Sequence, residues 1–129
     1  MKIMSRESVL KAKSFDFAIR IIKLNQYLRE KHSEYQLSQQ ILRAGTSVGA
    51  MVREAEHAES RRDFLHKLNI GLQEINECGY WLDLLSATNY LDKRMYESIR
   101  VELLKMLIAS IKTTKTKNKT QENYHLSSL

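Results

Sequence analysis

Two short acid–histidine pairs are the residues of this chain whose spacing could support metal chemistry. Glu54 precedes His57 by three positions, and Asp63 precedes His66 by the same interval. A carboxylate and an imidazole at this spacing share one helical face, which is how some helical bundles hold two metal ions in their core. On a helical wheel, however, both histidines lie on the side opposite the predicted core. We therefore expect no metal site and no cofactor.

Other catalytic patterns are missing from the sequence. It contains no glycine-rich phosphate loop, no zinc-ligand spacing and no nucleophile motif. The only cysteine, Cys78, falls on a predicted core stripe, where inert packing is its simplest role. Tyr80 and Trp81 could stack on bases, although packing within a bundle or between subunits is the commoner use of such a pair. We expect no enzymatic activity and no small-molecule substrate.

Basic residues gather in the middle of the chain, where two helices are predicted. They are Arg43, Arg53, Arg61, Arg62 and Lys67, and they alternate with Glu54, Glu56, Glu59 and Asp63. Two interpretations stay open. The charges form a salt-linked surface, or they contact phosphate groups, since Arg61 and Arg62 open a helix whose N-terminal amides also attract anions. The formal net charge of +6 is compatible with binding to RNA or DNA.

The composition favours one all-helical domain. The 129 residues include four glycines and no proline, and 28% of them are charged. A lone cysteine cannot form an internal disulfide, the first residues lack the apolar run of a signal peptide, and no run of about 18 apolar residues could span a membrane. We expect a cytoplasmic protein that has no membrane association.

Apolar residues recur at helical spacing in four segments. We predict helices over residues 5–31, 34–58, 61–87 and from Asp92 to about Lys112. Short loops make consecutive helices antiparallel neighbours, so the simplest architecture is an all-α, up-down-up-down four-helix bundle. Ser33, Ser60 and Asp92 are predicted to cap the second, third and fourth helices.

The bundle is predicted to occupy residues 1–112, and residues 113–129 form a separate segment. This segment has no apolar periodicity and contains several lysines. A disordered, polar and basic tail is the simpler expectation, and an arm that binds phosphate groups is the alternative.

Each predicted helix has one core stripe, and the first and fourth helices have further apolar residues beside it. The core stripes include Phe17, Ile21, Val48, Ile75, Leu82, Ile99 and Met106. In the first helix, a second stripe beside the core stripe consists of Phe15, Ile19 and Ile22. In the fourth helix, the apolar residues beside the core stripe are Val101, Leu104, Ile108 and Ile111.

Several small or apolar residues of the second and third helices point away from the core stripe. They are Thr46, Ala50, Ile70, Trp81 and Leu84. Scattered surface hydrophobes are one explanation, and a subunit interface is the one we favour. Glycines inside both helices, at Gly45, Gly49, Gly71 and Gly79, indicate close helix packing or, alternatively, a ligand lying against the backbone.

The middle of the chain resembles a known bacterial family. The sequences LRAGTSVGA (42–50), ESRRDFLHKL (59–68) and the region 73–85, which contains YWLDLL, are similar to the "four helix bundle protein" family, also called the 23S rRNA intervening-sequence protein or S23 family. The likeness extends over about residues 14–111. One departure is that many members have an asparagine where this chain has Met51, so a role tied to that asparagine is not expected here.

The resemblance implies a four-helix bundle that assembles into a ring, commonly a homopentamer. Some members are encoded within intervening sequences of 23S rRNA genes. A relative, the accessory variability determinant of diversity-generating retroelements, is a basic pentameric barrel that binds nucleic acid and a reverse transcriptase. The first hypothesis is therefore a homo-oligomeric binding protein whose partner is rRNA or another nucleic acid. The alternative is a protein-interaction or structural scaffold without nucleic-acid binding.

Overall fold

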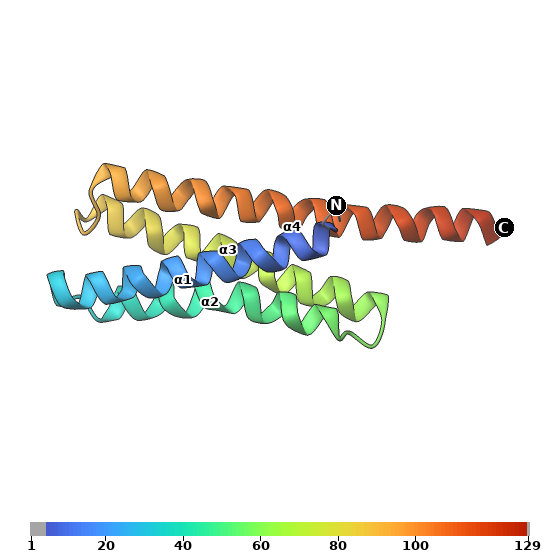
Figure 1. The fold of residues 1–129 in the computed structure, drawn as a ribbon, viewed down its shortest axis with the longest axis horizontal. Helices are drawn as coiled ribbons and strands as arrows, with labels where there is room; N and C mark the ends of the chain where they lie inside the picture. Colours follow the sequence, from blue (N-terminus) through green and yellow to red (C-terminus); the bar gives the residue numbers. More distant parts are fainter. Residues whose placement is uncertain (1–4, 129) are drawn as a thin grey trace, which may run out of the picture.

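The structure is a computed structural model, and four helices account for nearly all of it. It describes residues 5–128, with side chains for residues 5–115. The helices are α1 (Arg6–His32), α2 (Gln36–Glu56), α3 (Arg61–Ala87) and α4 (Lys93–Ser128). Successive helices run in opposite directions (Figure 1), and the described residues contain no strand. The predicted all-α antiparallel four-helix bundle is confirmed.

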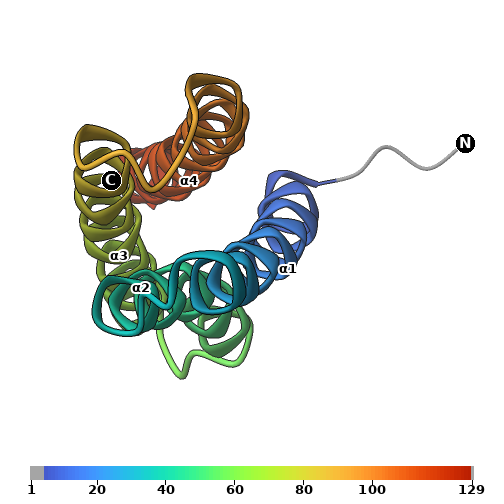
Figure 2. The same ribbon diagram turned by 90° about the vertical axis from the view of Figure 1, so that its left-hand side faces the viewer.

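The helices are arranged around a common core, as the view along the bundle shows (Figure 2). α1 packs against α2 and α4, and α3 also packs against α2 and α4. Three of these four pairings join helices that are consecutive in the chain. The fourth, between α1 and α4, joins the two ends of the bundle's sequence and has no connecting loop. In the described part of the chain, no helix is both long and apolar enough to cross a membrane.

The predicted core stripes are buried. Side chains with almost no exposed surface come from all four helices and include Phe17, Ile21, Ile41, Val48, Ile75, Leu82, Leu85, Ile99 and Met106. Cys78 is also buried, as predicted. Because helical periodicity alone identified these positions, the apolar stripe of each helix decides which face meets the core.

Two of the three predicted helix caps are confirmed. The Asp63 amide donates to Ser60 Oγ at 3.0 Å, and the Met95 amide donates to Asp92 Oδ1 at 2.8 Å. Each bond satisfies one of the backbone donors that the first turn of a helix leaves without an intrahelical partner.

The predicted cap of α2 is wrong, because Ser33 belongs to the end of α1. Ser33 adopts a left-handed conformation (φ 49°), which terminates α1. Glu34 then caps α2: its carboxylate accepts hydrogen bonds from the amides of Gln36, Leu37 and Ser38 at 2.7, 2.7 and 3.0 Å. A carboxylate can accept several bonds, whereas a serine hydroxyl usually satisfies one donor.

The predicted end of the fourth helix near Lys112 is also wrong. Thr113 is buried, its hydroxyl donates to the Ala109 carbonyl oxygen at 2.8 Å, and it lies 3.4 Å from the Arg6 carbonyl oxygen of α1. No glycine or proline follows Lys93, so the sequence contains no strong helix terminator. The tail was predicted to comprise residues 113–129, and its part beyond Lys115 lies outside the residues whose side chains are described.

Candidate interaction surfaces

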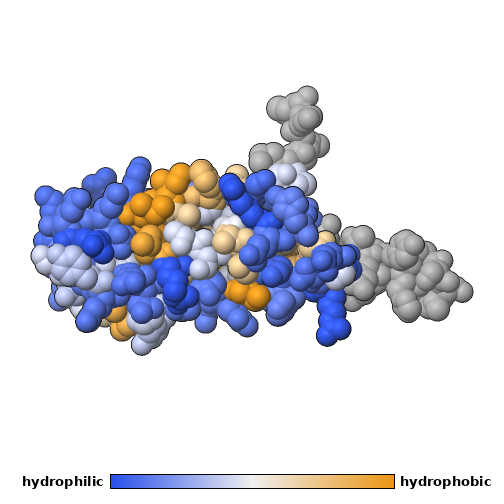
Figure 3. Space-filling model, turned by 90° about the horizontal axis from the view of Figure 1, so that it is seen from below, coloured by the Kyte–Doolittle hydropathy of each residue, from blue (hydrophilic) through white to orange (hydrophobic). Residues whose placement is uncertain are grey.

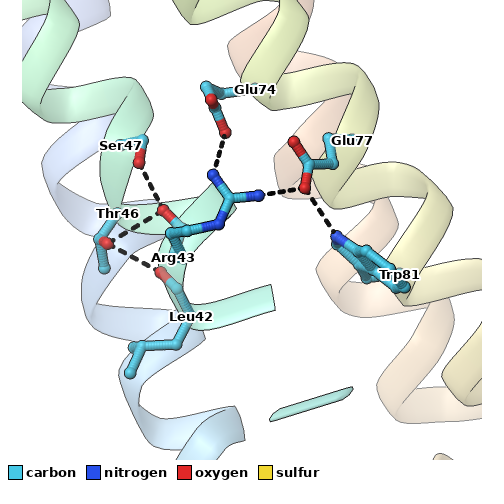
Figure 4. A network of polar contacts seen from close by, with 7 residues as sticks. All are labelled: Leu42, Arg43, Thr46, Ser47, Glu74, Glu77 and Trp81. Atoms are coloured by element: carbon cyan, nitrogen blue, oxygen red, sulfur yellow. Dashed lines mark hydrogen bonds and ion pairs between the residues drawn. The ribbon is translucent and has the colours of Figure 1, made fainter. Parts of the chain in front are cut away.

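Arg43 of α2 is held between two carboxylates of α3 (Figure 4). Its guanidinium lies 3.5 Å from Glu74 Oε2 and is in close contact with Glu77 Oε1. Glu77 also accepts a hydrogen bond from Trp81 Nε1 at 3.1 Å. A salt-linked surface and a phosphate contact were both open for Arg43, and its guanidinium is paired with protein carboxylates.

The other predicted basic residues do not form one continuous patch. Lys67 lies 3.4 Å from Glu54 Oε2, and the Arg53 guanidinium lies over the ring of Phe15, 5.8 Å from its centroid. Arg61 is half-buried, with Nε and one terminal nitrogen enclosed without a hydrogen-bond partner, and Arg62 is exposed. The structure thus divides these cations among an ion pair, a ring contact and the turn between α2 and α3.

The residues predicted to form a subunit interface are mostly half-buried. Ile70, Leu84 and Trp81 are partly covered within one chain, and Trp81 packs against the core cluster. Thr46 donates to the Leu42 carbonyl oxygen at 2.7 Å, and Ala50 is exposed. Their role between subunits stays a prediction, and larger exposed apolar side chains lie elsewhere.

Two apolar stripes are exposed on α1 and α4. Each side chain leaves between 37% and 53% of its surface accessible: Phe15, Ile19 and Ile22 on α1, and Val101, Leu104, Ile108 and Ile111 on α4. Figure 3, seen from below, shows apolar surface interrupting a mostly hydrophilic face. Sequence periodicity had found both stripes, but it could not show that no other helix of the bundle covers them.

The two stripes turn towards opposite edges of the bundle. Phe15 lies beneath Arg53 of α2, so the α1 stripe borders the α2 side. Arg100 pairs with Asp83 of α3 at 3.2 Å, and Leu104 follows Arg100 by one helical turn, so the α4 stripe borders the α3 side. The surface between the stripes is the seam where α1 meets α4.

The α1–α4 seam contains two neighbouring hollows. One has a volume of about 360 Å³ and the other about 460 Å³, and Lys13 and Lys105 line both. The Arg20 guanidinium crosses the seam to Glu102 Oε1 at 2.7 Å and to Ser98 Oγ at 2.9 Å. The seam is therefore a charged groove that runs between two apolar stripes.

The reactive side chains noted in the sequence include one buried thiol and two exposed imidazoles. Burial raises the pKa of the Cys78 thiol to about 12, and the nearby carboxylates of Glu77 and Glu74 act in the same direction. His57 and His66 are exposed, and within the described residues no three histidine, cysteine or acidic side chains form a group suited to a metal ion. The distinctive features of this chain are its surfaces.

These observations define a helical-bundle protein with exposed apolar stripes and a basic groove. The family model described as "23S rRNA-intervening sequence protein" matches residues 6–111. The chain belongs to this family.

A solved relative has the same fold. It is a protein of unknown function from the S23 ribosomal protein family of Bacteroides thetaiotaomicron VPI-5482, with 46% sequence identity and a TM-score of 0.85. The alignment covers 86% of this chain and 99% of that chain. A comparison with curated proteins finds no match.

Proposed function

We propose that this protein is a non-enzymatic, homo-oligomeric binding module whose partner is rRNA or another nucleic acid. The proposal of self-association is based on the two exposed apolar stripes on α1 and α4. Continuous apolar surface of this kind usually marks an interface, because water is a poor environment for it.

The stripes differ from each other, which favours a head-to-tail contact. If the α1 stripe of one copy packs against the α4 stripe of the next, each copy uses two different surfaces. Such heterologous contacts close into a ring when the rotation between copies is suitable. A ring agrees with the homopentamer that the family resemblance implies.

Charge and family membership support the nucleic-acid half. The chain has a formal net charge of +6, and the matching family is described by an rRNA intervening sequence. Cationic surface binds the phosphate backbone by releasing its condensed counterions, so the binding weakens as salt is added. The assignment of rRNA as the partner rests on the family description.

Light scattering after gel filtration tests the assembly. We expect a particle whose mass is a multiple of 15.1 kDa at micromolar concentration, and a monomer would contradict the proposal. Filter binding of 23S rRNA at low salt tests the partner. We expect retention that decreases steeply with added salt.

A scaffold that binds only proteins is the competing proposal. In that case the basic residues serve solubility, and partners recovered from a lysate would persist after nuclease treatment. An oligomer that retains no RNA or DNA at low salt would favour this scaffold over the nucleic-acid module.

A further inference from the structure

All the charged residues that line the hollow nearest the start of α1 are cations. Arg6 and Lys13 of α1 and Lys105 and Lys112 of α4 line it, with no carboxylate. Arg6 also donates a hydrogen bond to the Lys112 carbonyl oxygen at 3.3 Å. Like charges repel one another, so a hollow of this composition is stabilised by a bound anion.

The neighbouring hollow extends the positive surface along the seam. Its cations are Lys13, Arg20, Lys23 and Lys105, and its carboxylates are Asp16 and Glu102. The two hollows together have six cationic side chains and two carboxylates, an excess of four positive charges. Of the two carboxylates, Glu102 is already paired with Arg20.

The lysines of the groove have no carboxylate partner among the described side chains. Across residues 5–115, Lys13, Lys23, Lys105 and Lys112 are in no ion pair, whereas Arg43 and Lys67 on the α2–α3 side are paired with Glu74, Glu77 and Glu54. An unpaired ammonium group gives up only water when it binds an anion. Arg43 and Lys67 would first have to break a contact within the protein.

We propose that the α1–α4 groove binds the phosphate backbone of a nucleic-acid strand. This inference rests on the proposed nucleic-acid function and moves the binding site away from the arginines of α2 and α3. Lys105 and Lys112 are two helical turns apart, roughly 10 Å along the axis, so they can contact different phosphates of one strand. A row of charges at this spacing suits a linear polyanion.

The groove lies directly beside the apolar stripes that we assign to the contact between copies. Ile19 lines one hollow and Ile108 lines the other, next to the lysines. Phosphate contacts by the ammonium groups therefore provide the binding, while the stripes pack between copies. Since contacts of this kind read no base edge, we expect little sequence preference.

The double variant Lys13→Gln/Lys105→Gln tests the site, because both lysines line both hollows. Binding of a labelled single-stranded RNA oligonucleotide is measured by anisotropy over a range of salt concentrations. We expect an affinity loss of about tenfold or more at low salt, and a salt slope (log K against log salt) smaller in magnitude by about 1.4, since each contact to a single strand contributes about 0.7. Circular dichroism should show unchanged helicity.

The double variant Lys31→Gln/Lys93→Gln is the matched control. It removes the same charge from exposed positions outside the groove. Equal losses in both double variants would overturn the inference, since net charge alone would then explain binding. Full binding by the groove variant combined with lost binding by Arg62→Gln would also overturn it.

Two further results separate this inference from the function on which it rests. If the wild-type protein binds no RNA at low salt, the proposed nucleic-acid function fails and the groove assignment fails with it. If the wild-type protein binds RNA and poly-glutamate equally well at the groove, the function survives but the phosphate assignment is overturned.

Discussion

Gly45 of α2 lies directly against Ile21 of α1. A Cβ atom placed on Gly45 would be 2.8 Å from Cγ1 and 2.9 Å from Cγ2 of Ile21. Ile21 is fully buried, and a β-branched side chain in a helix has one strongly preferred rotamer, so it cannot turn aside. Only glycine allows the two helices to approach this closely.

We expect Gly45→Ala to destabilise the protein even though alanine is the better helix former. The added methyl group collides with Ile21, and overpacking of this kind typically costs about 1–3 kcal/mol. This outweighs the gain of about 1 kcal/mol in helix propensity. Urea unfolding at a fixed protein concentration measures the net change.

Gly71→Ala is the control for that substitution. A Cβ on Gly71 would lie 3.7 Å from Met51 Cβ, which is an ordinary contact. We expect this variant to be as stable as the wild type or more stable, by up to about 1 kcal/mol. Destabilisation of equal size in both variants would refute the assigned role of Gly45.

The head-to-tail assembly predicts that two variants, each with a different stripe blocked, can still associate with each other. Ile22→Glu blocks the α1 stripe, and Leu104→Glu blocks the α4 stripe, each by introducing a charge at an exposed apolar position. We expect each variant alone to be a folded monomer, because it lacks one half of the contact. An equimolar mixture should form a dimer in which the two intact stripes meet.

Light scattering distinguishes this arrangement from a symmetric one. If identical stripes met, α1 on α1 or α4 on α4, one of the two variants would dimerise without the other. The control Gln39→Ser, at an exposed position of α2 outside both stripes, should leave the assembly unchanged.

Removing the acid that spans the groove should strengthen RNA binding. Glu102 is paired with Arg20, so Glu102→Gln both removes a negative charge and releases a guanidinium towards the ligand. We expect a several-fold higher affinity and a salt slope larger in magnitude by about 1. The exposed pair contributes only about 0.2–1 kcal/mol to stability, so the fold should persist.

Glu97→Gln is the matching control, because Glu97 is exposed and its carboxylate lies 4.0 Å from Lys93 Nζ, outside the groove. An increase in affinity that is the same for both variants would show that the effect is not local to the seam.

The raised pKa of Cys78 predicts that the protein loses stability at high pH. Burial raises its pKa from 9.0 to about 12, so the folded protein holds this proton while the unfolded chain releases it. The contribution of this group is therefore constant below pH 9 and is lost progressively from pH 9 to about 12. Other groups titrate there, so the relevant quantity is the difference in unfolding free energy between wild type and Cys78→Ala.

We expect that difference to shrink as the pH rises above 9 and to be constant below it. Thiol labelling gives an independent check: the native protein should react slowly at pH 8, because the thiolate is the reactive form and the sulfur is buried. Rapid labelling of the native state would contradict the assigned environment.

Local periodicity was sufficient to predict the bundle and its core. Phe17, Val48, Leu82 and Met106 were placed in the core from spacing alone, since a helix with one apolar stripe has only one way to face its neighbours. The α2 cap was mispredicted because Ser33 and Glu34 are adjacent candidates, and the conformation at the end of α1 decides between them.

The surfaces were harder to predict because they depend on which helices meet. The sequence left a salt-linked surface and a phosphate contact open for Arg43, and only the packing of α3 against α2 shows Glu74 and Glu77 beside it. The α1–α4 groove was not anticipated at all, since Lys13 and Lys105 are distant in the chain and no local pattern connects them. Pairings between remote segments leave no trace in a single sequence.

α1 and α4 pack together although no loop connects them directly, and this affects the order in which the bundle folds. Their contacts join residues as far apart as Arg6 and Thr113, so closing the seam requires almost the whole chain to be ordered first. The three hairpin-linked pairings can form early, and we expect the seam to close last. The lysine groove then exists only in the completed bundle, so an unfinished chain would present its lysines separately and hold nucleic acid only weakly.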